Sequence, residues 1–487
     1  MNEQIRVLEP GALWNYFADI DAIPRASKKE AKIIAFMKAF GEKLQLPTYT
    51  DAAGNVIIKK AASKGMENRQ TVVLQSHLDM VHQKNADTSF DFETQGIEMF
   101  TDGDWVKAKG TTLGADNGIG VAAIMTLLAS ADIAHPAIEA LFTIDEETGM
   151  TGAKELRGGL LDGKILLNLD TEDDDELTIG CAGGIDVTAE GSYPEESIPA
   201  GYAGLKISLT GLTGGHSGVD IHLGRANANK LMNRLLWQLA GKYGIYISSV
   251  NGGSLRNAIP RESVAVIAVA ESSIDAVKHE IKDYEQVIKA EYLATDAALT
   301  VSAEATVTND KYANQEISYS IIRGIYACPN GIYRMTPGIE GLVQTSNNIA
   351  KVSIANGKLT VQCLTRSSVD TEKMDLAQSI TAAFEGCGAK TSFGSEYPGW
   401  APQPDAPVIK LMEKIYKELF GDNIHVNAIH AGLECGIIGG NYPGMQMVSF
   451  GPNIYGAHSP DERVQISSVQ KFWKYLLTVL KEFPLKN

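Results

Sequence analysis

Five histidine and carboxylate residues along the chain have the types and the order that a metal site needs. They are His77, Asp116, Glu147, Asp170 and His458. Imidazole nitrogens and carboxylate oxygens are hard or borderline ligands, which favour zinc, manganese or cobalt over a soft metal. Two divalent ions about 3.5–4 Å apart need a carboxylate that bridges them. We expect the glycine-flanked Asp116 to be that bridge. One ion would then add His77 and Asp170, and the other would add Glu147 and His458.

A pair of adjacent glutamates predicts hydrolytic chemistry at these ions. The run Asp145-Glu146-Glu147 follows an apolar stretch at residues 140–144. If Glu147 is a ligand, Glu146 cannot serve from the same direction and stays free. A free carboxylate beside a metal-bound water can act as the general base and later protonate the leaving amine. The alternative is an acidic, solvated loop, and the order of these acids among the other candidate ligands favours the catalytic interpretation.

The element that must position His77 is a strand that begins with the apolar run at residues 71–74. Side chains on a strand alternate with period 2, so His77 and Asp79 face the same way where the run ends. A carboxylate in that position can orient a ligating imidazole from behind. Taken alone, the pair is equally consistent with a structural histidine.

Further apolar runs at residues 140–144, 164–169 and 445–450 predict strands, and most of the candidate ligands follow such runs. Open α/β sheets place their sites beyond the carboxyl ends of the strands. Strands alternate with helices up to about residue 186, which predicts an α/β domain with a mainly parallel sheet flanked by helices. The pattern Ser27-x-x-Glu30 predicts a capping box at the start of one of these helices.

The domain organisation follows from the length of 487 residues and from two changes of pattern. A chain of this length is too long for one core. After residue 186 the pattern becomes α+β, with a clear antiparallel hairpin around Asn356-Gly357. After the proline- and glycine-rich segment 395–404, the α/β pattern resumes. We therefore expect a catalytic domain made from residues 1–186 and 398–487, with an inserted α+β lid domain at residues 187–397.

Composition narrows the class of protein. The net charge is −16, with 44% hydrophobic and 21% charged residues. An acidic chain without basic clusters argues against binding to nucleic acid or an anionic membrane. No apolar run approaches the roughly 20 residues of a membrane span, and the first residues lack the apolar core of a signal peptide. Five scattered cysteines without a C-x-x-C pair indicate reduced thiols and a cytoplasmic location.

Five motifs in sequence order resemble those of the dizinc exopeptidases related to aminoacylase and carboxypeptidase G, over nearly the whole chain. The motifs are SHLDM (76–80), GADNG (114–118), DEETG (145–149), NLDTE (168–172) and AHSP (457–460). The stretches GGHSGVDI, LRNAIPRE, TRSS and HAGLECG are most similar to the aminoacyl-histidine dipeptidase (Xaa-His dipeptidase, peptidase D) branch.

The resemblance implies hydrolysis of unblocked dipeptides, including carnosine-like Xaa-His substrates, by a metal-bridged water with Glu146 as the base. It implies two divalent ions per chain, with Zn²⁺ expected and Co²⁺ or Mn²⁺ as alternatives. It further implies that Asp79 supports His77, that the Asp116–Asn117 peptide is cis, and that His216 stabilises the oxyanion. Small peptides are the expected partners, together with a second copy of the chain that forms a homodimer through the lid.

Four residues are candidates for binding the substrate. Arg366 follows a strand and could hold the carboxylate of a dipeptide with its bidentate fork, although a surface arginine is the alternative. Asn257 could bind the same end of the substrate, while His430 and Glu434 could line the pocket. The open alternatives for function are a broader dipeptidase, a tripeptidase, an N-acyl-amino-acid hydrolase, or a metal-binding protein that has lost catalysis.

Overall fold

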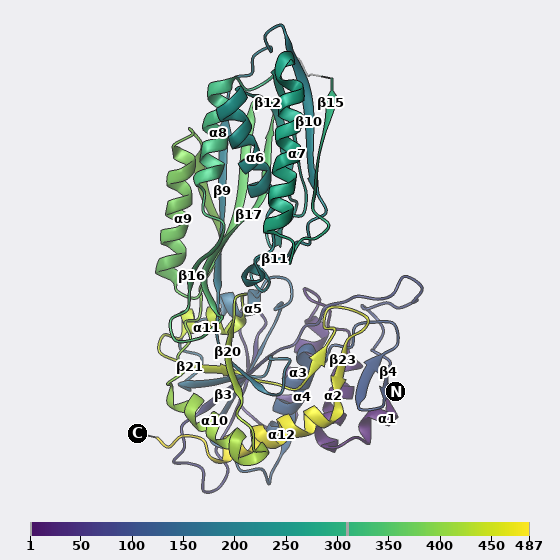
Figure 1. Cartoon of the computed structure of the whole chain (residues 1–487). Helices are drawn as coiled ribbons and strands as arrows, with labels where there is room; N and C mark the ends of the chain where they lie inside the picture. Colours follow the sequence, from purple (N-terminus) through teal and green to yellow (C-terminus); the bar gives the residue numbers. More distant parts are fainter. Residues whose placement is uncertain (1, 308–310, 487) are drawn as a thin grey trace. The chain divides into compact units, whose positions relative to one another are not determined.

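The computed structural model describes residues 2–307 and 311–486, which fold into two compact units (Figure 1). Unit 1 comprises residues 1–180, 402–428 and 433–487, and unit 2 comprises residues 181–401 and 429–432. The first unit is therefore built from both ends of the chain. The boundaries that the sequence predicts for the insertion are residues 187 and 397.

Unit 1 is organised around an eight-stranded sheet. In spatial order its strands are β1 (Thr48–Thr50), β2 (Val56–Lys60), β6 (Ile138–Thr143), β3 (Val72–His77), β7 (Ile165–Asn168), β21 (Gln446–Ser449), β8 (Glu176–Cys181) and β20 (His425–Ile429). The four central strands, β6 to β21, pair in parallel, whereas β1, β2 and β8 pair antiparallel. The predicted α/β fold is thus confirmed, with a parallel centre and antiparallel edges.

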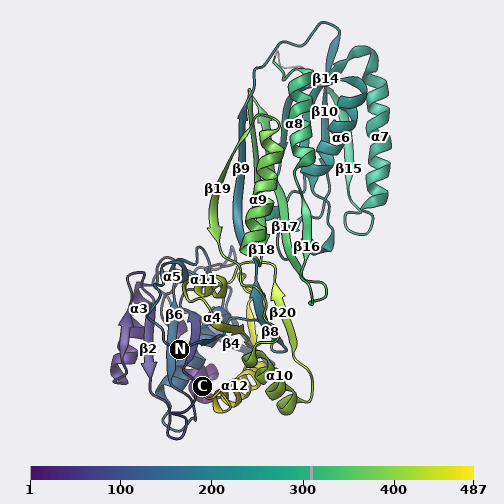
Figure 2. The ribbon, with the colours of Figure 1, turned by 90° about the vertical axis from the view of Figure 1, so that its left-hand side faces the viewer.

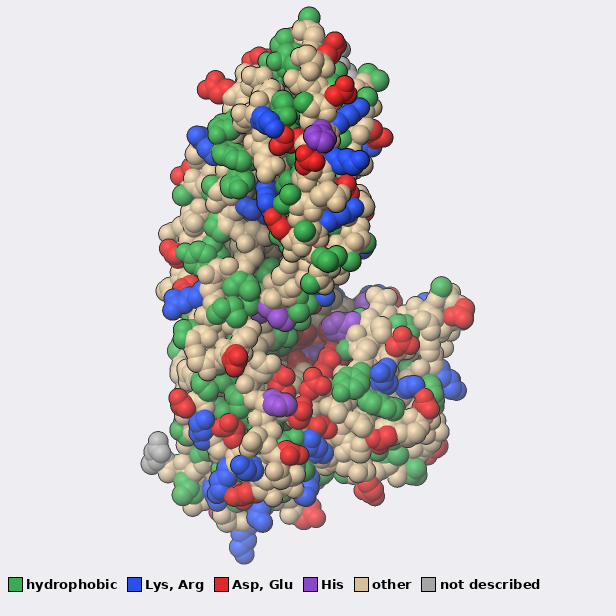
Figure 3. Space-filling view, in the orientation of Figure 1, with side chains coloured by type: hydrophobic (Ala, Val, Ile, Leu, Met, Phe, Trp, Pro, Cys, Tyr) green, Lys and Arg blue, Asp and Glu red, His purple; other side chains and the backbone are tan. Residues whose placement is uncertain are grey.

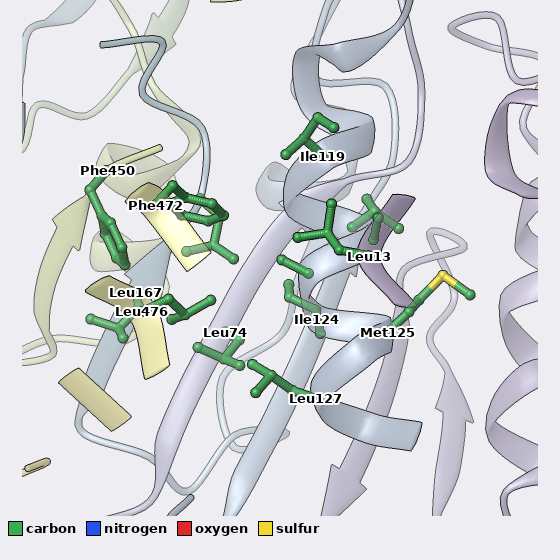
Figure 4. Packing of buried hydrophobic residues seen from close by; sticks show 14 of the residues in the cluster. Leu13, Leu74, Ile119, Ile124, Met125, Leu127, Leu167, Phe450, Phe472 and Leu476 are labelled. Carbon is green, nitrogen blue, oxygen red and sulfur yellow. The ribbon is translucent and has the colours of Figure 1, made fainter. Parts of the chain in front are cut away.

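Unit 1 contains the helices α1 (Glu3–Arg6), α2 (Gly11–Asp21), α3 (Ala31–Lys43), α4 (Ala115–Ala129), α5 (Thr151–Glu155), α10 (Pro407–Phe420), α11 (Glu434–Asn441) and α12 (Ile466–Lys481). Leu74 and Leu167, on neighbouring strands, point to the side where α4 and α12 lie (Figure 4). They belong to one core cluster with Leu127 and Leu476, whereas Val73 faces the other side. The same alternation puts the side chain of His77, the last residue of β3, on the face opposite to Leu74.

A second, four-stranded sheet in unit 1 carries one of the candidate ligands. Its order is β22 (Ile454–Tyr455), β23 (Arg463–Gln465), β5 (Trp105–Ala108) and β4 (Met99–Asp102). Strands β22 and β23 are antiparallel, so residues 456–462 form the loop of a hairpin. His458 lies in this loop.

Unit 2 contains a nine-stranded sheet whose pairings are all antiparallel. Its order is β15 (Thr300–Thr306), β10 (Tyr202–Thr210), β14 (Ser263–Ala270), β12 (Tyr246–Gly252), β17 (Val343–Ala355), β18 (Lys358–Ser367), β9 (Gly183–Ser192) and β19 (Lys390–Tyr397), with β16 (Gly331–Met335) beside β17. The predicted hairpin of β17 and β18 is present, and Asn356 and Gly357 both have positive φ, as a two-residue turn of this type requires.

One face of this sheet is covered by four helices: α6 (Ala228–Tyr243), α7 (Ile274–Glu291), α8 (Gln315–Ala327) and α9 (Asp370–Glu385). Figure 2 shows α9 alongside β9 and β18. In β10 the alternating residues Leu205, Ile207 and Leu209 are buried in the same core cluster as these helices, while Lys206 between them is only half-buried. Unit 2 therefore has a hydrophobic core of its own.

Two further observations concern the whole described chain. Within residues 2–307 and 311–486, no helix has both the length and the apolar character needed to cross a membrane. Over the same residues, none of the five cysteines forms a disulfide.

Candidate functional site

The candidate metal ligands of unit 1 come together at the carboxyl ends of its parallel strands. His77 is the last residue of β3, and Asp170 lies two residues beyond β7. Glu146 and Glu147 follow β6 closely. Because β3 pairs in parallel with both neighbours, these strand ends meet at one edge of the sheet. Asp and Glu side chains gather on unit 1 near the middle of the face in Figure 3.

Asp116 lies between two histidines and offers one carboxylate oxygen to each. Its Oδ1 is 3.1 Å from His77 Nε2, and its Oδ2 is 3.4 Å from His458 Nε2. His77 Nε2 is also 3.4 Å from Asp170 Oδ1, and His458 Nε2 is 3.0 Å from Glu147 Oε2. In each of the two resulting groups the ligand atoms lie within 4.8 Å of one another. The two groups match the sets that the sequence predicts for two ions sharing Asp116.

The electrostatics of this cluster favour cations. In the metal-free protein, hydrogen bonds to Asp116 and Glu147 raise the pKa of His458 to about 11. Burial raises the pKa of Asp170 and of Glu147, although the nearby histidines oppose that shift. Carboxylates packed this closely are stabilised as anions by added positive charge. The two histidines therefore act as substitute cations for the acids around them.

One buried oxygen indicates that the cluster fits a metal ion. Glu147 Oε1 is buried and makes no hydrogen bond to the described part of the chain. A buried carboxylate oxygen without a donor is costly, and buried charges in proteins are normally paired or bound to a metal. Together with the donor set of imidazole and carboxylate, this oxygen supports metal binding at Glu147.

Asp79 is fully buried behind His77 and connects two of the site's loops. Its Oδ1 lies 3.4 Å from His77 Nδ1. It also accepts hydrogen bonds from the backbone N–H groups of Glu146, at 3.1 Å, and Glu147, at 3.3 Å. The expected capping box is wrong here, because α3 begins at Ala31 with Glu30 at its N-cap position, and the Ser27 hydroxyl instead donates to Asp79 at 2.8 Å. Asp79 thus orients the imidazole and holds the loop that carries both glutamates.

Glu146 is not a member of either ligand group that contains Asp116. It forms another close group with His77 and Glu147. In the metal-free protein, burial raises the pKa of Glu146 well above its usual value, and the neighbouring Asp170 adds to the shift. A carboxylate with a raised pKa is a stronger base, which suits a group that must accept a proton from water.

Glu434 lies in unit 1 at the start of α11, buried beside β3 and β6. Its Oε2 accepts hydrogen bonds from Gln75 Nε2 and Thr143 Oγ1, both at 2.7 Å. Burial raises the pKa of Glu434 to about 8. Gln75 and Thr143 were not predicted from the sequence, because each occupies an inner strand position that looks like a core residue.

A buried arginine that no sequence motif marks explains the glycines around Asp116. Arg25 donates to the carbonyl groups of Gly114, Leu78 and Asp79, so it joins the end of β3 to the Asp116 loop. A Cβ atom on Gly114 would lie 2.4 Å from Arg25 Nη2, and one on Gly118 would lie 2.8 Å away. The glycines of the GADNG motif therefore make room for the guanidinium. The Asp116–Asn117 peptide bond between them is cis, as the resemblance implies.

Unit 2 contains its own cluster of three candidate residues that are far apart in the sequence. Arg366 is 4% exposed; its Nη1 donates to the Tyr397 hydroxyl at 2.9 Å, and its Nε is buried without a hydrogen bond in the described structure. Its Nη2 lies 3.5 Å from His216 Nε2. His430 is hydrogen-bonded through Nε2 to the Ser346 hydroxyl at 2.8 Å. The buried guanidinium retains a donor that could bind an anion.

The backbone around His216 favours one tautomer of its imidazole. The N–H groups of Gly218 and Val219 donate to His216 Nδ1 at 3.2 and 3.0 Å. Because Nδ1 accepts hydrogen bonds, a neutral ring must carry its proton on Nε2. Burial lowers the pKa of His216, and the positive charge of Arg366 lowers it further. The two backbone donors favour a neutral imidazole with its proton on Nε2, whereas the Arg366 Nη2 donor 3.5 Å from that nitrogen favours the opposite tautomer.

Asn257 is the fourth candidate in unit 2. It precedes β13 (Ala258–Ile259), the short strand that pairs with β11 (Gly215–His216). Its backbone carbonyl accepts a hydrogen bond from Ser217 N at 2.8 Å, and its side chain is exposed. The predicted residue is thus next to the His216 loop, and its contact with that loop is made by the backbone.

Comparisons with known proteins give a consistent result over the full length. The model of the peptidase family M20/M25/M40 matches residues 73–482. The cytosol non-specific dipeptidase of Escherichia coli (strain K12) is 43% identical over 484 residues, which are 99% of this chain and 100% of the relative. The crystal structure of aminoacylhistidine dipeptidase from Vibrio alginolyticus is similar at a TM-score of 0.96 and 42% identity, covering 100% of this chain and 99% of that chain. Aminopeptidase PepT from Bacillus cereus ATCC 10987, at a TM-score of 0.56 and 15% identity over 98% of this chain and 99% of that one, shares the fold.

Proposed function

The chain belongs to the peptidase family M20/M25/M40, and we propose that it is a metal-dependent dipeptidase acting on unblocked dipeptides, Xaa-His dipeptides among them. The observation that carries this proposal is the position of Asp116, whose two oxygens face two separate groups of ligands. Both full-length relatives are dipeptidases by name. Their names differ in the breadth of substrates, so the preference for a C-terminal histidine is the finer part of the proposal.

Two divalent ions, with zinc expected, are proposed to bind at His77, Asp116, Glu147, Asp170 and His458. When bound, such ions polarise the scissile carbonyl and acidify a water molecule. Asp79 keeps the His77 ring in place from its buried position. The alternative ions are Co²⁺ and Mn²⁺.

Glu146 is proposed to move the proton of the reaction. It accepts a proton from the water whose oxygen attacks the peptide carbonyl carbon. It then gives that proton to the amine nitrogen as the C–N bond breaks, so that a carboxylic acid and an amine leave. Its place in a close group with His77 and Glu147 supports this role.

The unit 2 cluster is proposed to bind the substrate. The fork of Arg366 would hold the C-terminal carboxylate, with Asn257 and His430 beside it. Glu434, in unit 1, is the remaining candidate for substrate binding. The Nε2–H of His216 would donate to the oxyanion, a role that the two backbone donors at Nδ1 support. A cytoplasmic location and a homodimer formed through residues 187–397 complete the proposal.

A pair of isosteric variants tests the assignment of the two glutamates. Glu146→Gln should keep its metal content and lower kcat by about 10²–10⁴-fold, since the amide cannot accept a proton. Glu147→Gln should lose part of its metal, measured by elemental analysis after dialysis. If the Glu146 variant loses metal and the Glu147 variant keeps it, the two roles are reversed.

A substrate panel tests the class of reaction on the same metal-analysed sample. We expect turnover of Ala-His and Ala-Ala, and little turnover of a tripeptide, of N-acetyl-Ala-His or of the C-terminal amide of Ala-His. Rapid hydrolysis of the acetylated substrate would point to an N-acyl-amino-acid hydrolase. Comparable rates for the dipeptide and its amide would contradict the clamp at Arg366.

A further inference from the structure

The hairpin loop that carries His458 ends in a buried carboxylate with an unusual set of partners. Glu462 is 3% exposed. Its Oε2 accepts hydrogen bonds from the backbone N–H groups of Leu113, at 2.7 Å, and Gly114, at 2.9 Å. Its Oε1 accepts from Ala115, at 2.8 Å, and from Asp116, at 3.3 Å. One side chain therefore binds four consecutive N–H groups that are 346 to 349 residues away in sequence.

These four N–H groups belong to the segment that presents the bridging carboxylate. Asp116 is the second residue of α4, whose first N–H groups have no partners within the helix. Buried backbone N–H groups need acceptors, and the two oxygens of one carboxylate supply them here. Asp116 and Asn117 have non-helical backbone angles, so Glu462 supplies acceptors to the irregular segment that leads into the regular part of α4, although it comes from a distant part of the chain.

On its other side the same segment is held by Arg25. Its guanidinium donates to the Gly114 carbonyl and pairs with Asp21 at 2.9 Å. The Asp116 loop therefore lies between a buried anion that binds its N–H groups and a buried cation that binds a carbonyl. Arg25 also binds the end of β3, so it connects the Asp116 segment to the strand that carries His77. Glu462 connects the same segment to the loop that carries His458.

From this arrangement we propose that Glu462 is a positioning residue that fixes His458 and Asp116 relative to each other for metal binding. The two residues belong to the same ligand group, with His458 Nε2 3.4 Å from Asp116 Oδ2. His458 lies four residues before Glu462 in one short loop, and the Glu462 N–H donates to the Ser459 carbonyl at 3.1 Å. This inference rests on the proposed metal-dependent function. It adds that the ion site with His458 and Asp116 depends on Glu462.

Glu462→Gln is the direct test, with Glu139→Gln as the matched control. The amide nitrogen that replaces one carboxylate oxygen cannot accept hydrogen bonds, so two of the four N–H groups lose their partner. Glu139 is also 3% exposed and accepts two backbone N–H bonds, from Asp162 and Gly163, but it lies in the first half of β6, away from the ligands. Both variants remove one buried carboxylate charge, and only the first one touches the Asp116 loop.

The experiment measures metal binding to the metal-free proteins. Calorimetric titration with Zn²⁺ gives the number of ions and their affinities, and the visible absorption spectrum after loading with Co²⁺ reports the ligand geometry. We expect Glu462→Gln to bind one ion about 10–100-fold more weakly, as loss of a group that orients ligands typically does, and to show an altered Co²⁺ spectrum. Glu139→Gln should titrate like the wild type. Two ions bound by Glu462→Gln with wild-type affinity and an unchanged spectrum would overturn the inference.

Two further measurements keep the test decisive. If Glu462→Gln does not fold, Glu462→Asp is the second variant, because it keeps the charge and shortens the side chain. The same selective loss of affinity at one ion is expected. Wild-type titration by this variant would overturn the proposal. Dipeptide turnover by the wild type is measured separately. An inactive wild type whose metal binding still depends on Glu462 would refute the proposed function alone, while an active wild type with an indifferent Glu462 would refute this inference alone.

Discussion

At the scale of single residues, His430 is a buried histidine whose charge state links pH to stability. Burial lowers the pKa of His430 to about 3, and the nearby Arg366 adds to the shift. In the unfolded chain a histidine titrates near about 6.5. Between these pH values the unfolded state therefore binds a proton that the folded state does not. The free energy of unfolding consequently falls as the pH drops below about 6.5.

We expect His430→Gln to flatten this dependence. The wild-type unfolding free energy should decrease by up to about 1.4 kcal/mol per pH unit between about pH 6 and pH 4 through this group alone, and the variant should lack that contribution. The pH dependence is measured by urea unfolding at pH 7, 6 and 5, with hydrogen exchange in unit 2 as the signal. His279→Gln, at an exposed site on α7, is the control and should keep the wild-type slope. Parallel slopes for the wild type and His430→Gln would contradict the prediction.

The residues that the sequence could identify are those whose chemistry is visible in a short motif. His77, Asp116, Glu147, Asp170 and His458 are polar residues that interrupt or follow apolar runs, and they lie together as those patterns indicate. Arg25 and Glu462 could not be found in this way. Their partners are backbone groups far away in sequence, and no side-chain pattern marks which N–H groups need an acceptor. The capping box predicted at Ser27 was wrong because α3 starts only at Ala31, and the Ser27 hydroxyl donates to the distant Asp79, a contact that no local pattern marks.

At the scale of elements, the close contact of α4 with the strands determines where Asp116 lies. A Cβ atom on Gly120 would lie 2.5 Å from Ser76 Oγ and 2.8 Å from the Leu169 carbonyl oxygen. That carbonyl also accepts a hydrogen bond from Asn117 Nδ2 at 2.6 Å. The first turn of the helix is therefore packed directly onto β3 and the segment after β7.

Gly120→Ala should destabilise unit 1 by about 1–3 kcal/mol, because an added methyl group in a tight core forces neighbouring groups to move. It should also weaken metal binding, since it moves the start of α4. Gly241→Ala is the matched control in α6 of unit 2, where no heavy atom lies within 4 Å of the added carbon. This change should stabilise by about 0.5–1 kcal/mol, as alanine favours a helix. Urea unfolding of both proteins measures the effects, and equal signs would refute the packing argument.

The elements with strong local signals were predictable, and those defined by distant pairing were less so. The β17–β18 hairpin is encoded by Asn356-Gly357 between two alternating segments, and its register follows from the turn. The antiparallel edges of the unit 1 sheet have no comparable signal, because an apolar strand looks the same whichever way its neighbour runs. α12 begins at Ile466, and Asp104 accepts hydrogen bonds from the Ser467 backbone and hydroxyl groups in its first turn, a contact across the fold that no local pattern marks.

At the scale of the whole molecule, removing the metal should affect the two units unequally. The proposed ligands all belong to unit 1, whose close carboxylates repel one another without cations, whereas unit 2 has its own core. A ligand at 100 times its Kd stabilises the folded state by about 2.7 kcal/mol. We expect chelation to speed hydrogen exchange in β3 and α4 markedly and to leave β17 and β18 unchanged. Equal deprotection of both units would show that metal binding stabilises the molecule as a single body.

The position of β21 determines when during synthesis the catalytic unit can form. This strand lies inside the unit 1 sheet, between β7 and β8, yet it is made from residues 446–449. A nascent chain that has emerged to residue 401 carries nearly all of unit 2, but its first sheet has a gap at its centre. The hairpin with His458 and Glu462 appears later still. Nearly all of the inserted unit has therefore been synthesised before the surrounding one, and the proposed metal site is complete only after translation of the C-terminal segment.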